Sequence, residues 1–246
     1  MPTRSKRSTA DRPAVGDGAA RRPALADPLP SPWAPGSERD RLRASKRQAV
    51  LQTAARIFNE KGFHATSLDE VAERLHITKP TLYYYVKNKD EILFECVNAG
   101  LQMLEDAIQA ERARGGRAID QLVAAMRSYV EIVTADFGMC VIRVGEDPLP
   151  AASRRALRSF KAKLDAHFRE LVRRGIDEGS IRPCDPKIAA FTLAGALSWI
   201  GRWYQPDGPL GPDEIARQCI DLLAGGLCTP RSHTRLRGRG LAPVVA

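Results

Sequence analysis

The sequence predicts an all-α protein, and three observations support this. Between residues 45 and 228, apolar residues recur every three or four positions, which is the spacing of one helix face. Residues that favour helix starts precede several of these stretches, and glycines or prolines separate them. We therefore expect about nine helices, three in a small N-terminal domain and the others in a larger C-terminal domain.

The composition indicates where the folded part begins and ends. Of the 246 residues, 43% are hydrophobic, which is enough for one small and one larger helical core. Residues 1–44 are rich in Pro, Ala, Arg and Ser and residues 229–246 are rich in Arg, so we expect both tails to be disordered. The expected domains are residues 45–90 and 91–228. Most of the net charge of +9 lies in the tails, which either attract phosphate groups or only solubilise the chain.

Several classes of protein are disfavoured. No run of eighteen apolar residues exists and the N-terminus lacks the apolar region of a signal peptide, so we expect a cytoplasmic protein without a membrane span. Five cysteines without a C-x-x-C pair favour reduced thiols, although a redox sensor stays open. Four scattered histidines lack metal-ligand spacing, so we expect no metal and no cofactor.

The first three helices are defined by their ends. The first has apolar residues at helical spacing and ends at Gly62. The second begins at a capping box formed by Ser67 and Glu70. After a short turn, Thr78 caps the third, with Pro80 in its first turn. The second and third helices are therefore short and close together in the chain.

The third helix carries side chains that suit DNA. It exposes Lys79, Thr81 and three consecutive tyrosines, residues 83–85, whose hydroxyl and ammonium groups donate to phosphate oxygens. Lys and Thr also reach base edges in a major groove. A packed helical hairpin with an aromatic core is the alternative, but the two capped helices with a donor-rich second helix favour DNA binding.

A resemblance to a known family rests on two segments, A-A-R-I-F-N-E-K-G-F-H-A-T-S-L-D-E-V-A-E-R-L and I-T-K-P-T-L-Y-Y-Y-V-K-N-K-D-E-I-L. Over residues 45–95 the chain resembles the helix-turn-helix DNA-binding domain of the TetR/AcrR family of one-component regulators. One departure is His76, where members usually have Gly, which adopts a left-handed turn more readily. The resemblance implies DNA contacts from eight residues: Ser67, Thr78, Lys79, Thr81, Tyr83, Tyr84, Tyr85 and Lys89.

Helical spacing continues through the rest of the chain. Helices are expected from Lys89 to about Arg114, Ala118 to Phe137 and Ala151 to Glu178, with an interruption at Gly138 and a short apolar piece around Cys140 to Val144. A further helix begins at the cap Asp185 and runs through Tyr204, and the last covers residues 212–227.

The last two helices predict a homodimer. The first of them is apolar on nearly all sides, so more than one side must be buried. Packed against a second copy, the two helices would form a four-helix contact. A dimer also brings two recognition helices about 34 Å apart, which matches one turn of DNA. Completion of a monomeric core is the alternative.

A second resemblance covers about residues 140–228. The segment A-G-A-L-S-W-I-G-R-W-Y-Q-P-D-G-P-L-G-P-D-E-I-A is similar to the ligand domain of family members that sense acyl-CoA thioesters. It implies a pocket near Trp199, Arg202 and Trp203. An acyl chain needs apolar walls and the CoA phosphates need Arg or Lys. Candidate wall residues, for each of which core packing is the alternative, are Met126, Val130, Phe160, Leu164 and Phe168.

The sequence thus predicts a dimeric transcriptional regulator, a repressor that binds a palindromic double-stranded DNA operator and is released by a small apolar effector such as an acyl-CoA. A multidrug or efflux-type regulator with another hydrophobic ligand is the nearest alternative. An enzyme acting on CoA thioesters is disfavoured, because no G-x-S-x-G, P-loop, dinucleotide or H-E-x-x-H motif occurs. A third alternative is an architectural DNA-binding protein that uses its Arg-rich tails.

Overall fold

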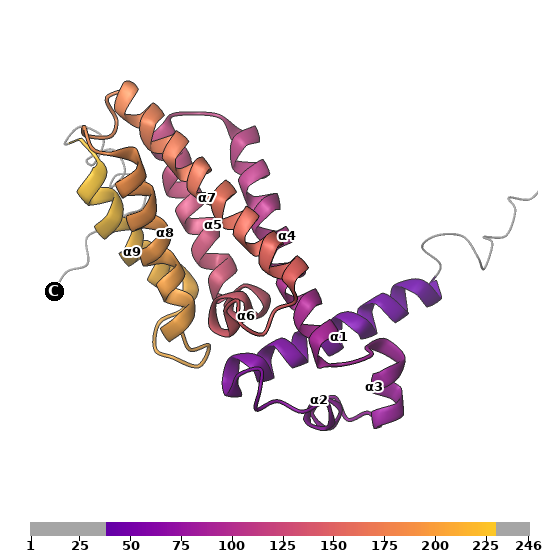
Figure 1. Cartoon of the computed structure of the whole chain (residues 1–246). Coiled ribbons are helices and arrows are strands. Elements are labelled where there is room, and N and C mark those ends of the chain that lie inside the picture. Colours follow the sequence, from indigo (N-terminus) through magenta and orange to yellow (C-terminus); the bar gives the residue numbers. More distant parts are fainter. Residues whose placement is uncertain (1–37, 230–246) are drawn as a thin grey trace, which may run out of the picture. The chain divides into compact units, whose positions relative to one another are not determined.

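The computed structural model describes residues 38–229, and helices make up most of this part (Figure 1). This confirms the all-α prediction. The helices are α1 (Glu38–Lys61), α2 (Leu68–Arg74), α3 (Lys79–Tyr85), α4 (Lys89–Arg114), α5 (Ala118–Thr134), α6 (Asp136–Val144), α7 (Ala151–Asp177), α8 (Pro186–Trp203) and α9 (Pro212–Leu227). None of them is long and apolar enough to cross a membrane. The described residues do not include residues 1–37 and 230–246, which make up most of the two predicted tails.

Helix α1 starts earlier than predicted. Its first residue is Glu38, so the prediction of a disordered tail through residue 44 is wrong for residues 38–44. The proline-rich composition ends at Pro35, and the next residues are mostly good helix formers. Glu38 and Asp40 also lie in the first turn, where acidic side chains interact favourably with the helix dipole.

The predicted helix caps are present. The Ser67 hydroxyl accepts a hydrogen bond from the Glu70 amide at 3.2 Å, and the Thr78 hydroxyl accepts one from the Thr81 amide at 3.4 Å. The side chain of Asn88 accepts from the Glu91 amide at 2.7 Å and caps α4. Each cap satisfies an amide that has no partner within its helix, which is why α2 and α3 can be as short as seven residues.

The turn between α2 and α3 depends on His76. Its φ angle is 52°, in the left-handed region, and it is the one non-glycine residue with positive φ in residues 38–229. The amide of His76 donates to the Glu73 carbonyl at 3.0 Å, and that of Ile77 donates to the Ala72 carbonyl at 3.0 Å. The left-handed residue therefore closes the end of α2, at the cost of strain that a glycine would avoid.

The larger helical body is built around α5. This helix packs against α4, α7, α8 and α9, and Figure 1 shows it among them. Residues such as Leu122, Met126 and Phe168 are fully buried in the core of this body. A second hydrophobic core contains residues of α1, α2, α3 and α4, among them Phe58 and Leu82. Three residues of α6 belong to this second core: Phe137, Cys140 and Val141.

The boundary between α5 and α6 differs from the prediction. Helix α5 ends at Thr134, whereas the sequence predicted a helix to Phe137 and a break at Gly138. Gly138 instead lies inside α6. A Cβ atom there would lie 2.0 Å from the carbonyl oxygen of Ile132. The glycine is needed because two backbone segments approach closely, and not because the helix ends.

Candidate DNA-binding surface and ligand pocket

Helix α3 presents polar side chains to solvent. Tyr83 and Tyr84 are 46% and 63% exposed, and Lys79 and Thr81 are also exposed. Leu82 points the other way and is fully buried in the N-terminal core. Tyr85 is only half-buried and packs against that core. The helix is therefore held by its apolar side while its hydroxyl and ammonium groups stay available.

Five of the eight predicted DNA contacts already have hydrogen-bond or ion-pair partners within the protein: Ser67, Thr78, Lys79, Thr81 and Lys89. The Lys79 ammonium group lies 2.8 Å from the Asp69 carboxylate, which raises the pKa of Lys79 above its ordinary value. Both side chains are more than half exposed, so this ion pair is weak and a phosphate can replace the carboxylate. The Ser67 oxygen serves as a helix cap but is exposed, so its hydrogen stays available for a phosphate.

Lys89, another predicted DNA contact, binds backbone groups of the protein itself. Its ammonium group donates to the carbonyl oxygens of Phe63, His64 and Thr66 at 2.8, 3.3 and 3.1 Å. It also lies 4.5 Å from the centre of the Phe63 ring. An ammonium group has three hydrogens, and all three are used here. Lys89 thus fixes the loop before α2 to the start of α4.

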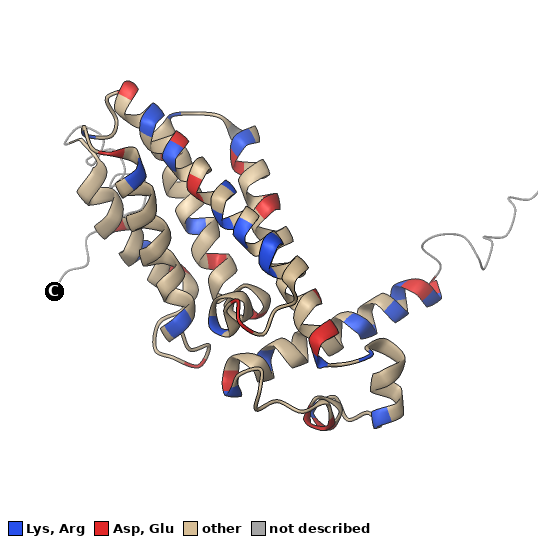
Figure 2. Cartoon of the chain, viewed as in Figure 1, with Lys and Arg blue, Asp and Glu red and all other residues tan. Residues whose placement is uncertain are grey.

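Arg43 is a basic residue of this surface that the sequence analysis missed. Its guanidinium group lies 5.1 Å from the centre of the Tyr84 ring, in the geometry of a cation–π contact. Lys and Arg are frequent in the first half of α1, as Figure 2 shows. Its place within residues 1–44 predicted that Arg43 lies in a disordered tail, and only the early start of α1 brings it beside α3.

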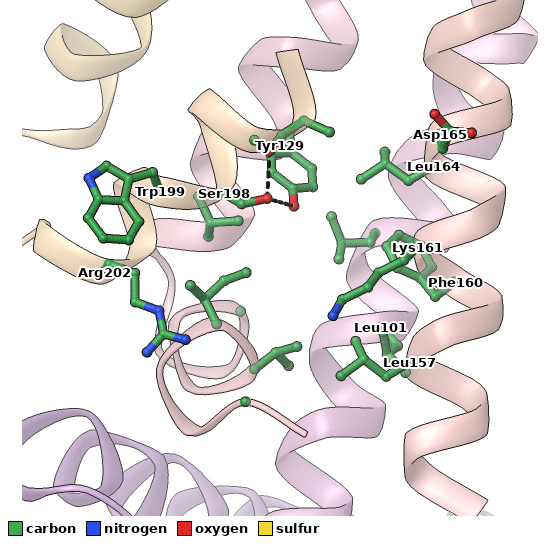
Figure 3. Close-up of a pocket in the computed structure, with 18 of the residues that line it drawn as sticks. Leu101, Tyr129, Leu157, Phe160, Lys161, Leu164, Asp165, Ser198, Trp199 and Arg202 are labelled. Atoms are coloured by element: carbon green, nitrogen blue, oxygen red, sulfur yellow. Dashed lines mark hydrogen bonds between the residues drawn. The ribbon is translucent and has the colours of Figure 1, made fainter. Parts of the chain in front are cut away.

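The larger body contains a pocket of about 570 Å³ (Figure 3). Helices α4 to α8 all contribute to its walls, which are mostly apolar. Four of the eight predicted ligand residues line it: Phe160, Leu164, Trp199 and Arg202. The volume and the apolar walls are typical of a site for a small hydrophobic molecule.

The other four predicted ligand residues do not line this pocket. Met126, Val130 and Phe168 are fully buried in the core, where neighbouring side chains surround them. Trp203 is 46% exposed and is not among the wall residues. Helical spacing identifies the inward face of a helix, but it does not distinguish a residue that meets a neighbour from one that meets a cavity.

The pocket also has polar wall residues that the sequence analysis missed. Tyr129 and Ser198 are joined by a hydrogen bond of 2.8 Å between their hydroxyl groups. Lys161 lies 2.7 Å from Glu146, which also pairs with Arg158 at 2.9 Å. These two cations lower the pKa of Glu146 below its ordinary value. Tyr129 and Ser198 sit in apolar helical stretches, so no sequence signal marked them.

Helix α6 connects the pocket to α1. Gly138, Val141 and Ile142 line the pocket, while Asp136 at the start of the same helix pairs with Arg56 of α1 at 2.8 Å. The Asp136 carboxylate also accepts from Gln52, and its carbonyl accepts from Asn59. Helix α6 therefore links the wall of the pocket to α1, which belongs to the same core as α3.

Arg143 makes a second connection from α6. Its guanidinium group donates to the Asn59 carbonyl of α1 at 2.8 Å, to the Gly201 carbonyl of α8 at 2.9 Å and to the Tyr204 carbonyl. Burial, with a smaller effect of the nearby Arg202, lowers the pKa of Arg143 below its ordinary value. One side chain thus joins three segments of the molecule.

Helices α8 and α9 leave a large apolar surface exposed. Its most exposed members are Leu222, Trp199 and Ile188, at 78%, 65% and 63%, and Phe191 and Trp203 are also exposed. A groove between the two helices continues this surface and includes Ile188, Leu193 and Leu223. Apolar patches of this kind on a folded chain usually mark an interaction site.

Two family models match the chain. The model described as "Bacterial regulatory proteins, tetR family" matches residues 50–96. The model described as "Tetracyclin repressor-like, C-terminal domain" matches residues 115–227. The first match contains α2 and α3, and the second contains α5 to α9, so both parts of the molecule are represented.

Similar proteins cover most of the described chain. The HTH-type transcriptional repressor KstR2 of Rhodococcus jostii is 26% identical over 195 residues, which cover 77% of this chain and 95% of that protein. The structure of AibR in complex with isovaleryl coenzyme A and operator DNA is 28% identical, with a TM-score of 0.62, and the match covers 72% of this chain and 97% of AibR. A TetR/AcrR-family regulator from Thermobifida fusca is 30% identical, with a TM-score of 0.54, and the match covers 74% of this chain and 98% of that one.

Proposed function

The chain belongs to the TetR/AcrR family of transcriptional regulators, and from this premise we propose that it is a homodimeric repressor that an acyl-CoA thioester releases from its operator. In this proposal residues 45–90 bind DNA, and residues 91–228 bind the ligand and form the dimer. The observation that carries the proposal is the exposed face of α3, where hydroxyl and ammonium groups lie together on a helix anchored by Leu82.

DNA binding would use α3 in the major groove. Tyr83 and Tyr84 offer hydroxyl groups to phosphates, and Lys79 offers an ammonium group to a phosphate or a base edge. The hydroxyl groups of Thr78 and Thr81 are hydrogen-bonded to each other at 2.8 Å, so this pair has one remaining hydrogen to donate. One short helix gives little specificity by itself. Two copies, related by a twofold axis and about 34 Å apart, would read the two halves of a palindrome.

The dimer would form through α8 and α9. The exposed side chains of Ile188, Phe191 and Leu222 are large and apolar, and their burial against a second copy removes them from water. A twofold interface places the same surface on both chains, so one apolar patch is enough. KstR2 is described as a repressor, which favours repression over activation for this chain as well.

The ligand would place its acyl chain among Leu104, Phe160 and Leu164. The phosphates of CoA need cations, and the pocket includes Lys161 and Arg202, with Arg158 nearby through Glu146. The complex of AibR with isovaleryl coenzyme A supports this class of ligand. Other hydrophobic compounds are the alternative, because the walls are mainly apolar.

Release from DNA would depend on α6. A ligand can change operator affinity only by the difference between its affinities for the two conformations, typically about 1–3 kcal/mol. Contact with Val141 and Ile142 would shift α6 and, through Asp136 and Arg143, the position of α1. The spacing of the two α3 helices would then no longer fit the operator.

The test uses a DNA duplex selected from a random pool by the full-length protein. Fluorescence anisotropy measures operator affinity while isovaleryl-CoA, longer acyl-CoA thioesters and free CoA are added. We expect the thioesters to weaken binding at least tenfold and free CoA to have little effect. The variant Ala194→Phe, which fills the pocket, should bind the operator normally and fail to respond. Release by unrelated apolar compounds but by no thioester would support the alternative ligand class.

A second variant tests the route of the signal. Asp136→Asn keeps the size of the side chain but removes its charge opposite Arg56. We expect thioester affinity, measured by calorimetry, to stay within about twofold of the wild type, while release from the operator weakens severalfold. Normal release by this variant would exclude the Asp136 contact from the coupling.

A further inference from the structure

Two hydroxyl groups interrupt the apolar wall of the pocket. Tyr129 comes from α5 and Ser198 from α8, and both line the pocket (Figure 3). Their oxygen atoms are 2.8 Å apart. Tyr129 is only 6% exposed, so its hydroxyl group has little access to bulk water and depends on partners within the pocket.

The direction of this hydrogen bond follows from a neighbouring one. The Ser198 oxygen lies 2.6 Å from the carbonyl oxygen of Ala194, one turn earlier in α8. A carbonyl oxygen can only accept, so the single hydrogen of Ser198 points to Ala194. Tyr129 must therefore donate its own hydrogen to the Ser198 oxygen.

Both hydroxyl hydrogens of the pair are thus used, and only acceptor positions remain. The Tyr129 oxygen keeps its acceptor capacity, and the Ser198 oxygen keeps one lone pair. Burial raises the pKa of Tyr129, more than the Ser198 bond lowers it, so the phenol stays protonated. Lys161 donates to Glu146 and Arg202 donates to the Arg143 carbonyl, and both cations keep further hydrogens, which the proposed function assigns to the CoA phosphates.

We infer that the pocket selects acyl groups that carry a hydroxyl group, which donates its hydrogen to the Tyr129–Ser198 pair. This rests on the proposed function, because it concerns the acyl part of the same ligand. A saturated acyl chain would cover the phenol oxygen and leave this acceptor without a hydrogen-bond partner, which weakens binding. The thioester carbonyl is itself an acceptor, so it does not fit this position either.

Matched ligands test the inference. Octanoyl-CoA is compared by calorimetry with its hydroxy and oxo derivatives, with the substituent placed at each position along the chain. We expect one hydroxyoctanoyl-CoA to bind about fivefold to tenfold more tightly than octanoyl-CoA, as one added hydrogen bond predicts. The oxo derivative with its substituent at the same position should bind no more tightly than octanoyl-CoA. Equal binding by all three, or a preference for the oxo compound, would overturn the inference.

Two variants identify the atoms involved. Tyr129→Phe keeps the ring and removes the phenol oxygen, so the advantage of the hydroxy compound should shrink, because only the Ser198 oxygen can still accept. Ser198→Ala removes the acceptor of the phenol hydrogen, so Tyr129 can donate to the carbonyl of the oxo compound. The affinity for the oxo compound should then rise severalfold. Circular dichroism and the melting temperature check that both variants fold. An undiminished preference in Tyr129→Phe would show that another residue selects the hydroxyl group.

A further experiment uses ligands that contain no CoA. Octan-1-ol and 1-methoxyheptane have the same formula, but only the alcohol can donate a hydrogen bond. We expect the alcohol to raise the melting temperature more than the ether does, and Tyr129→Phe to reduce this difference. If this holds while no thioester binds, the hydroxyl site stands and the CoA proposal fails. If thioesters bind without any preference for a hydroxyl group, the CoA proposal stands and this inference fails.

Discussion

Helices α3 and α8 both expose aromatic side chains, but their surroundings differ. Tyr83 and Tyr84 of α3 lie near Lys79 and Thr81, so the surface mixes rings with hydrogen-bond donors. Trp199 and Phe191 of α8 lie on the same helix as the exposed Ile188, and the groove beside α9 is bordered by leucines. The α3 surface suits a phosphate backbone, whose oxygens accept hydrogen bonds. The α8 surface suits another apolar surface.

The comparison shows that exposure by itself does not identify a function. A tyrosine keeps its hydroxyl group hydrated until DNA replaces the water, so α3 can stay exposed at little cost. An isoleucine or leucine has no such partner, and its exposure is costly until another apolar surface covers it. The neighbours of each aromatic ring decide which partner fits, and substitutions on the two surfaces test this difference.

The largest effect is expected on the α8–α9 surface. The double variant Ile188→Glu with Leu222→Glu would bury four carboxylates in each dimer, so we expect the dimer dissociation constant to rise at least about a hundredfold. Sedimentation equilibrium measures this, and operator binding should be lost with the dimer. Met103→Glu, a change at an exposed apolar residue of α4, is the matched control. A double variant that remains dimeric would place the interface elsewhere.

A smaller effect is expected on α3. Replacing Tyr83 and Tyr84 together by Phe keeps the rings and removes both hydroxyl groups. Because hydrogen bonds to charged groups contribute about 1.5–3 kcal/mol each, operator affinity should fall at least tenfold, without a change in the dimer. Fluorescence anisotropy measures the affinity. Tyr85→Phe, at a half-buried position, should have a weaker effect, and wild-type affinity of the double variant would argue against phosphate contacts by these hydroxyls.

Arg43 extends the DNA-binding surface in a different way. The slope of the logarithm of operator affinity against the logarithm of salt concentration reports the number of phosphate contacts. In Arg43→Ala we expect this slope to become less steep by about 0.9, because one phosphate contact is lost. Arg173→Ala, which removes an exposed arginine paired with Glu170 on α7, should leave the slope unchanged. An unchanged slope for Arg43→Ala would mean that Arg43 only stacks on Tyr84.

The smallest effect is expected at His76, where the backbone adopts a left-handed conformation. A β-branched side chain is poorly tolerated there, so His76→Val should reduce the free energy of unfolding by about 1–2 kcal/mol. His76→Gly should be close to neutral, because relief of strain offsets the greater freedom of the unfolded chain. Urea denaturation measures both, and equal stability of all three proteins would remove the argument from backbone strain.

The sequence was most informative where structure depends on near neighbours. The caps at Ser67 and Thr78 bind amides only three residues away, so their residue types and spacing were sufficient to predict them. Lys89 shows the opposite case. The family resemblance implied a DNA contact for Lys89, but the fold brings three carbonyl groups from residues 63–66 to its ammonium group.

The pocket shows the same limit. Helical spacing correctly placed Met126, Val130 and Leu164 on inward faces, but only Leu164 meets the cavity. Tyr129 lies one position before Val130 and meets the cavity instead. Which inward side chain faces empty space depends on the sizes of residues on neighbouring helices, and those are distant in the sequence.

The sequence by itself determined the helical class, the short capped helices and the donor-rich face of α3, because these depend on residues within one or two helical turns. The tertiary structure decided the walls of the pocket and the contacts of Asp136 and Arg143. Those features join residues that are far apart in the chain. Their positions follow from how whole helices pack, which no local pattern encodes.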